Sequence, residues 1–251
     1  MSAHTLNRLR ELKLSGMAQA LEQQQKQVST FEGLSFVERL DFLLDNEHCI
    51  RENRKQDRLI TQAKFKVAAT IQNIEYSAQR NLKKELVARL AQCDWIERQQ
   101  NLLITGPCGS GKTYLACAVG HAACLRDYRV RYYRLSRLFL ELTQSKADGT
   151  YTKLLRQLSR VQVLVLDDWG LEALQPAQRH DLMEILDDRH GSSSTVVISQ
   201  LPTDQWYMSI GDNTLADAIL DRLMHNAHSL KLQGESMRKV LGQLTEREHL
   251  G

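Results

Sequence analysis

One short glycine-rich run constrains the fold of this chain more than any other sequence feature. The run is Gly106-Pro107-Cys108-Gly109-Ser110-Gly111-Lys112-Thr113, which fits the pattern G-x-x-x-x-G-K-[ST] without a mismatch. It lies between the apolar segment 101–105, a candidate strand, and a helical pattern. Glycine permits backbone conformations that turn consecutive N–H groups inward, and the following helix places its positive end at the same point. We therefore expect a strand, an anion-binding loop and a helix in that order.

The residue types at the end of this run indicate that the anion is a nucleotide. The Lys112 ammonium can reach the β- and γ-phosphates, and the Thr113 hydroxyl is a hard oxygen ligand of the kind that Mg²⁺ prefers. ATP and Mg²⁺ are therefore the expected cofactors, and the alternative is a glycine-rich turn that binds nothing. The predicted nucleotide-binding residues are Gly106, Pro107, Cys108, Gly109, Ser110, Gly111, Lys112, Thr113 and Tyr114.

A second motif combines a buried strand with two carboxylates. The apolar run 163–166 is followed by Asp167 and Asp168, which is typical of a central strand that emerges at its C-terminal edge. Ligands of parallel sheets gather at that edge. We expect Asp167 to hold the magnesium and Asp168 to act as the general base for an attacking water. The alternative is a pair of solvated surface aspartates.

The rest of the chain indicates an α/β protein. Further strand-like segments, separated by helical patterns such as 178–187, are 130–133, 161–166, 195–199 and 229–232. Strands that alternate with helices predict a parallel sheet covered on both faces. The three prolines (Pro107, Pro176 and Pro202) fall at expected loops or helix starts.

The first part of the chain has a different pattern. Residues 1–75 are expected to form a small helical module with one apolar face per helix, and 29–33 a turn between two helices. Residues 72–77 and 81–100 are expected to connect this module to the strands. The predicted domains are therefore 1–75, a helical module for assembly, DNA or partner binding, and 76–251, the ATPase domain.

Composition excludes several classes of protein. Hydrophobic residues make up 42% and charged residues 25% of the chain, close to the averages of globular proteins. The sequence has neither an apolar stretch of the roughly 18 residues that span a bilayer nor the apolar core of a signal peptide, so we expect a cytoplasmic protein without a membrane partner. The five cysteines form no C-x-x-C pair and are expected to be reduced thiols.

Four motifs together resemble the IstB family. They are the glycine-rich run, 166–170 (LDDWG), 198–202 (ISQLP) and 234–239 (GESMRK). IstB proteins are ATP-dependent helpers of insertion-sequence transposition and stand with the helicase loader DnaC among the AAA+ ATPases. The resemblance extends along nearly the whole chain and implies an AAA+ P-loop sheet preceded by a small helical domain.

The resemblance also implies further catalytic residues. Gln200, or its neighbour Ser199, corresponds to the sensor that positions the water, although asparagine is more common there. Arg222 resembles the arginine finger that enters the ATP site of the neighbouring subunit, and Arg238 resembles the second sensor arginine. A planar, permanently charged fork suits both roles. The alternative is that these two are ordinary surface arginines.

Two basic regions are candidates for DNA contact. Six cations face two acids within 51–66 (Arg51, Arg54, Lys55, Arg58, Lys64 and Lys66 against Glu52 and Asp57). Five arginines within 126–137 alternate with tyrosines and face only Asp127 (Arg126, Arg129, Arg131, Arg134 and Arg137, with Tyr128, Tyr132 and Tyr133). Such surfaces attract the phosphate backbone without reading bases. The alternative is that one alternate face of 130–133 is buried and that the arginines are solvated without any role in DNA contact.

The family resemblance implies an ATPase that assembles on duplex DNA and regulates its cognate transposase. A finger supplied by a neighbouring subunit implies self-association that depends on nucleotide. A helicase loader of the DnaC type is the main alternative, because it shares every ATPase residue. A small-molecule kinase is a further alternative, but the helical module and the trailing sensor segment have no role in one.

Overall fold

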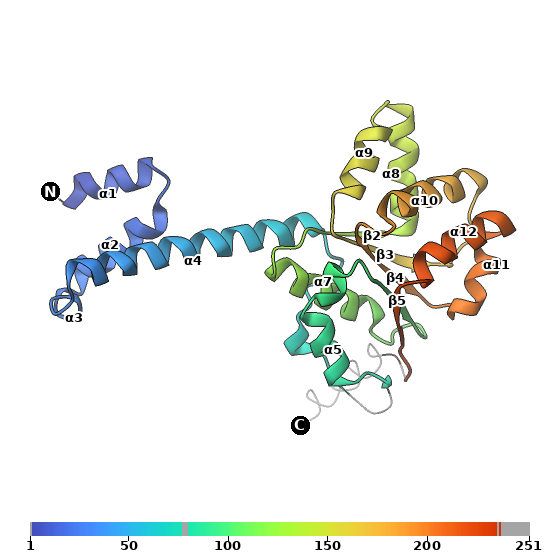
Figure 1. Ribbon diagram of the computed structural model, residues 1–251, viewed down its shortest axis with the longest axis horizontal. Helices are drawn as coiled ribbons and strands as arrows, with labels where there is room; N and C mark the ends of the chain where they lie inside the picture. Colours follow the sequence, from blue (N-terminus) through green and yellow to red (C-terminus); the bar gives the residue numbers. More distant parts are fainter. Residues whose placement is uncertain (1, 77–79, 235, 237–251) are drawn as a thin grey trace, which may run out of the picture. The chain divides into compact units, whose positions relative to one another are not determined.

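The structure is a computed structural model that describes residues 2–76, 80–234 and 236. The chain divides into two compact units, Met1–Arg58 and Leu59–Gly251. Figure 1 follows the elements along the chain. None of the described helices is both long and apolar enough to cross a membrane.

The first unit is helical. It contains α1 (Ser2–Glu11), α2 (Ser15–Lys26), α3 (Val28–Phe31) and the first part of α4 (Phe36–Ala63). Helix α3 covers most of 29–33, so the turn predicted there was wrong in its position and follows Phe31 instead.

The crossing of α2 and α4 is organised by a buried acid. The Glu47 carboxylate accepts hydrogen bonds from the Gly16 and Met17 N–H groups at 2.7 and 3.1 Å, where the N–H groups of α2 have no partner within the helix. Burial alone would raise the pKa of Glu47, but hydrogen bonds from Arg51, Met17 and Gly16 outweigh it and lower the pKa. A Cβ at Gly16 would lie 2.6 Å from the Glu47 Cα, so only glycine permits this close approach.

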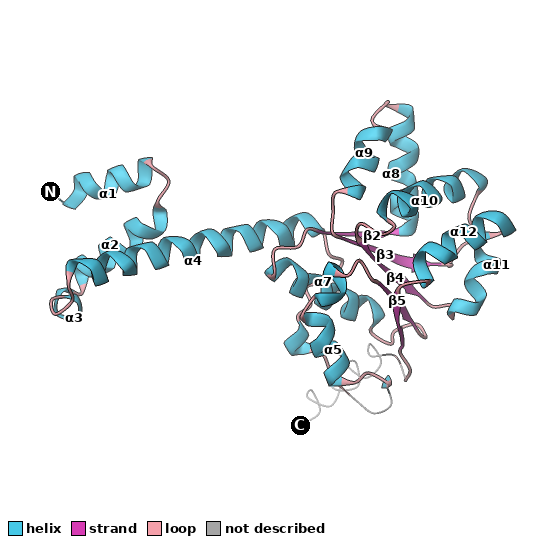
Figure 2. Cartoon of the chain, viewed as in Figure 1, coloured by secondary structure: helices cyan, strands magenta, loops and turns pink. Residues whose placement is uncertain are grey.

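The second unit contains a parallel five-stranded sheet with the order β2-β3-β4-β1-β5 (Figure 2). The strands are β1 (Asn101–Thr105), β2 (Val130–Arg134), β3 (Val163–Trp169), β4 (Ser194–Ser199) and β5 (Ala227–Lys231). This confirms the predicted fold class. The prediction for β3 was wrong at both ends, because the strand begins at Val163 and continues through both aspartates to Trp169.

Helices cover both faces of the sheet. One face packs against the end of α4, the 3-10 turn η1 (Ile71–Asn73), α5 (Lys84–Ala91), α6 (Asp94–Glu97) and α7 (Lys112–Leu125). The other packs against α8 (Leu135–Ala147), α9 (Tyr151–Ser159), α10 (Pro176–Arg189), α11 (Trp206–Ile210) and α12 (Asn213–Met224), with the 3-10 turn η3 (Thr203–Gln205) preceding α11. Residues 81–100, expected only as a connector, therefore supply two helices and several core side chains.

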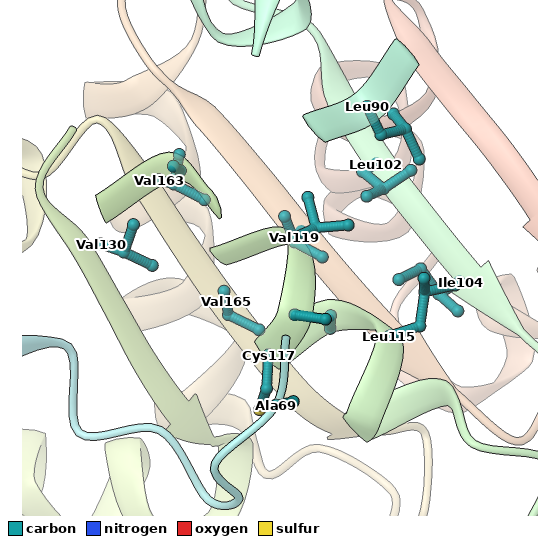
Figure 3. Packing of buried hydrophobic residues seen from close by; sticks show 14 of the residues in the cluster. Ala69, Leu90, Leu102, Ile104, Leu115, Cys117, Val119, Val130, Val163 and Val165 are labelled. Atoms are coloured by element: carbon teal, nitrogen blue, oxygen red, sulfur yellow. The ribbon is translucent and has the colours of Figure 1, made fainter. Parts of the chain in front are cut away.

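Alternation along β3 separates the two cores. Val163 and Val165 face the α7 layer, and Leu164 and Leu166 face the opposite layer. Figure 3 shows Val163, Val165 and Val130 beside Val119 of α7. Because residues 163–166 of β3 are all buried, this strand lies inside the unit, as its continuous apolar run predicted.

A buried arginine joins α10 to the sheet. The Arg189 guanidinium donates to the carbonyls of Leu158, Val161 and Ser194, and to the Thr195 hydroxyl. Burial lowers its pKa. Four acceptors offset much of the cost of burying this charge.

We predict that Arg189→Met lowers the free energy of unfolding by about 3 kcal/mol, because three carbonyls lose their donor in a site that water does not reach easily. Urea unfolding followed by circular dichroism measures the change. Arg156→Met, on the exposed side of α9, is the matched control and should change stability by less than about 0.5 kcal/mol. Equal losses in the two variants would contradict a structural role for Arg189.

Candidate functional site: a nucleotide-binding loop

The glycine-rich loop lies between β1 and α7, as predicted. The φ angles of Gly106, Gly109 and Gly111 are +149°, +79° and +88°, values that residues with a Cβ rarely adopt. A Cβ at Gly106 would lie 2.5 Å from the Leu232 carbonyl oxygen, and one at Gly109 would collide with the Ser236 side chain. The loop therefore needs glycine both for its backbone conformation and for its contact with the chain that follows β5.

Lys112 is the first residue of α7 and is buried against the loop. Its Nζ donates to the carbonyls of Gly106 and Pro107, both at 2.7 Å. Burial lowers the pKa of Lys112, and electrostatic interactions with neighbouring acidic groups oppose that shift. The ammonium thus lies beside the loop at the start of α7, where a helix offers unpaired N–H groups to an anion.

Asp167 is the acceptor at which several elements meet. Its Oδ2 accepts from the Thr113 hydroxyl at 2.9 Å and from the Tyr132 hydroxyl at 2.6 Å, and its Oδ1 accepts from the Asp168 N–H at 2.8 Å. The Lys66 ammonium lies 3.9 Å from Oδ2. The structure therefore brings together Thr113 and Asp167, the two residues predicted to bind the metal. A hydroxyl and a carboxylate at the loop fit the oxygen ligands that Mg²⁺ takes beside phosphates.

Asp168 lies on the other side of β3. Its φ is +67°, and the register between β3 and β4 shifts at this point. Its Oδ2 is 3.9 Å from the Arg134 Nε, and it lines a cavity of about 360 Å³ with residues of α8 and of the 170–174 loop. A non-glycine residue in this conformation is strained, and such strain concentrates at functional sites.

The sensor candidates follow β4, which lies between β3 and β1. The Ser199 hydroxyl donates to the Trp169 carbonyl and accepts from the Leu201 N–H, so it holds the turn. The Gln200 side chain is exposed at the same edge of the sheet. Its position there is compatible with the predicted role, which stays a prediction.

Arg222 lies at the opposite end of the strands, where β1 begins. It is near the end of α12, its side chain forms an ion pair with Asp187 at 2.7 Å, and its carbonyl accepts from Asn101 at the start of β1. Since Gly106 follows the other end of β1, roughly 16 Å of strand separates the two ends. Arg222 is therefore not placed to contact a nucleotide on its own loop. Arg238 lies outside the described residues.

Sequence reasoning missed three residues around the loop. Tyr132 and Lys66 contact Asp167, and Arg80 donates to the Ser110 carbonyl at 3.0 Å. The alternation of β2 places Tyr132 inward, in agreement with the alternative that one face of 130–133 is buried, but it did not indicate the contact with Asp167. Lys66 and Arg80 belong to no motif.

The structure corrects part of the DNA-binding hypothesis. Tyr132 and Tyr133 are buried in the two cores, so they cannot alternate with arginines on a surface. Lys66 in the other basic region lies against Asp167, and Arg51 is paired with Glu47. The arginines exposed near the ends of β2 are Arg126, Arg129, Arg134 and Arg137.

The loop between β1 and α7, beside an acidic residue on β3 of a parallel sheet, is the arrangement of the AAA+ P-loop fold. The fold resembles the DnaC helicase loader (TM-score 0.57, 21% identity, 66% of this chain and 97% of that one). It also resembles AMPPCP-bound DnaA from Aquifex aeolicus (TM-score 0.59, 17% identity, 73% of this chain and 56% of that one).

Sequence comparison gives the family. The family described as IstB-like ATP binding protein matches residues 7–243, and the chain belongs to it. A relative from Sinorhizobium fredii is 46% identical over 95% of this chain and 98% of its own length. One from Pseudomonas fluorescens is 48% identical over 81% of this chain and 88% of its own. Both are named as insertion-sequence ATP-binding proteins.

We predict that Tyr132→Phe lowers the free energy of unfolding by about 1.5–3 kcal/mol, because a buried carboxylate loses a strong hydrogen bond. Urea unfolding at neutral pH measures this. The control is Tyr133→Phe, one residue along β2 on the other face, whose hydroxyl accepts a long bond (3.3 Å) from Arg131 and donates to the Glu141 carboxylate but does not touch Asp167. The Tyr133→Phe variant should lose less than half as much free energy of unfolding. A Tyr132→Phe protein as stable as wild type would count against the contact.

Proposed function

We propose that this protein is an ATPase that assists the transposition of an insertion sequence. It binds ATP with Mg²⁺ in the glycine-rich loop, hydrolyses the nucleotide, and uses the nucleotide state to control assembly on duplex DNA and the action of a transposase. The observation that best supports this proposal is the contact of Thr113 with Asp167 beside the loop glycines. The names of the relatives support the insertion-sequence context.

Different residues of the site are assigned to nucleotide binding and to the chemical step of hydrolysis. The loop N–H groups and Lys112 hold the triphosphate, and Thr113 and Asp167 would hold a Mg²⁺ ion, which would neutralise phosphate charge. Asp168 accepts a proton from the attacking water, and Gln200 orients that water. The water oxygen attacks the γ-phosphorus, and the bond to the oxygen that bridges to the β-phosphate breaks, so that ADP and phosphate are the products.

The position of Arg222 supports self-association. Because it lies at the end of the strands opposite its own loop, we assign its guanidinium to a nucleotide bound to another subunit. In that setting it stabilises the charge that develops on the transferred phosphoryl group, and Arg238 is the proposed second sensor. Release of Arg222 from Asp187 accompanies assembly.

DNA and transposase contacts are assigned to surfaces outside the nucleotide site. Arg126, Arg129, Arg134 and Arg137 form the proposed contact with backbone phosphates in the ATPase domain, 76–251. The helical module, 1–75, exposes apolar residues on α4, with Phe36 79% exposed and Val37, Leu40 and Leu44 also exposed. Such a patch is typical of a binding surface for another protein. The protein acts in the cytoplasm, where it meets its DNA.

We expect Lys112→Ala to abolish ATP binding and Asp168→Asn to keep binding while lowering turnover by at least about 100-fold, because only the second residue acts in the chemical step. Binding of a fluorescent ATP analogue and phosphate release in assembled protein measure the two effects. An exposed aspartate, changed in Asp204→Asn, is the control. Lys112→Ala with intact affinity and turnover would refute the nucleotide site.

Assembly should require ATP, Mg²⁺ and duplex DNA together. Electron microscopy and sedimentation with and without each component test this, and complexes should weaken steeply with salt because phosphates supply the contacts. Arg222→Ala should assemble but lose at least about 100-fold in turnover, since one finger arginine contributes on that scale. A monomer under all conditions would overturn the assembly model, and capture of a replicative helicase in place of a transposase would favour a helicase loader.

A further inference from the structure

A lysine outside every nucleotide-binding motif lies at the proposed metal site. Lys66 is in the segment that follows α4, and its Nζ is 3.9 Å from the Asp167 Oδ2. The Lys66 side chain is 27% exposed and the Asp167 side chain 2%. Among the described residues, this is the ion pair of Asp167. The remaining contacts of that carboxylate are hydrogen bonds from Thr113, Tyr132 and the Asp168 N–H.

The backbone around Lys66 is fixed against α7. Phe65 packs on Gly120, where an added Cβ would lie 2.7 Å from the Phe65 ring. The backbone of Lys66 and Val67 hydrogen-bonds with the Cys117 thiol. Ala69 is buried in the same layer and lies beside Cys117 in Figure 3. The position of the ammonium is therefore set by packing on both sides of Lys66.

We propose that Lys66 is a counter-ion of Asp167 that competes with the divalent metal and thereby sets how much Mg²⁺ the site requires. The inference rests on the proposed magnesium site at Thr113 and Asp167. A divalent cation at Asp167 would face a positive charge a few ångströms away, and the ammonium must move when the metal binds. Lys66 thus acts through Asp167 as a positioning residue and has no role in the chemical step.

A consequence follows for the chain next to α4. Lys66 is three residues beyond Ala63, the last residue of α4. Movement of its side chain on metal binding removes one contact of the segment 64–69, which directly follows α4 and is otherwise held by packing. The coupling needs no large rearrangement, because the ammonium need only leave the Oδ2 for solvent.

The test is a Mg²⁺ titration of nucleotide binding. Full-length protein and a fluorescent, non-hydrolysable ATP analogue are mixed with EDTA, and Mg²⁺ is added while anisotropy is followed. Lys66→Gln should lower the half-saturating Mg²⁺ concentration by about three- to tenfold, because one repelling charge is removed from a partly solvated site. Its affinity for the analogue without metal should stay within about twofold of wild type.

Two control variants separate charge from packing. Lys66→Arg keeps the charge and should keep the wild-type Mg²⁺ requirement, and Lys64→Gln removes an exposed charge nearby and should also leave it unchanged. An unshifted or higher Mg²⁺ requirement in Lys66→Gln would overturn the inference. Loss of analogue binding by the wild-type protein, with or without metal, would instead overturn the proposed nucleotide site.

Hydrogen exchange gives a second readout that does not depend on turnover. In the wild type, residues 64–69 should exchange faster when Mg²⁺ and the analogue are both present than when either is absent. In Lys66→Gln, the same segment should exchange equally with and without Mg²⁺. An exchange rate of residues 64–69 that is the same with and without Mg²⁺ in the wild type would contradict the proposed release of Lys66.

Discussion

The nucleotide site depends on one buried carboxylate. Asp167 is 1% exposed, and an ionised group in such surroundings is costly unless donors or cations surround it. Its donors come from separate parts of the chain: Thr113 on α7, Tyr132 on β2 and the main chain of β3 itself. They meet only because β2 pairs with β3 and α7 packs across the same face. The fold and the site are therefore stabilised by the same contacts.

The parallel sheet gives the two ends of its strands different chemistry. The loop and Gln200 follow the C-terminal ends of β1 and β4, and Asp167 lies in the C-terminal half of β3, whereas Arg222 lies where β1 begins. A strand of five residues is rigid and extends for roughly 16 Å, so no side-chain rotation in one chain can bring the two sets together. Any reaction that needs both must use two subunits. The requirement for assembly is thus a consequence of strand direction, given the proposed role for Arg222.

Local patterns predicted the elements well, and they failed where tertiary contacts decide. The glycine run, the apolar strands and the carboxylates on β3 carry their signals within a few residues, and these signals identified the sheet and the loop. Residues 81–100 were expected only as a connector, although 84–91 forms an amphipathic helix, and Val87, Leu90 and Trp95 become core only when α7 is beside them. For Tyr132 the local pattern allowed two interpretations, a DNA-contacting surface and burial of one alternate face of 130–133, and only the contact with Asp167 decides between them. Lys66 and Arg80 act through partners more than 25 residues away, which no local pattern reveals.

The contacts of Arg80 and Leu232 connect the loop to the chain before β1 and to the chain after β5. Arg80 donates to the Ser110 carbonyl, while the backbone of Arg80 accepts from Gln233 beyond β5. Leu232 touches Gly106 so closely that a Cβ there would collide with its carbonyl. A phosphate group that shifts the loop backbone must therefore disturb the chain before β1 and the chain after β5 together. Since the first leads back to α4 and the second leads to the proposed sensor segment, nucleotide state can reach both without a separate relay.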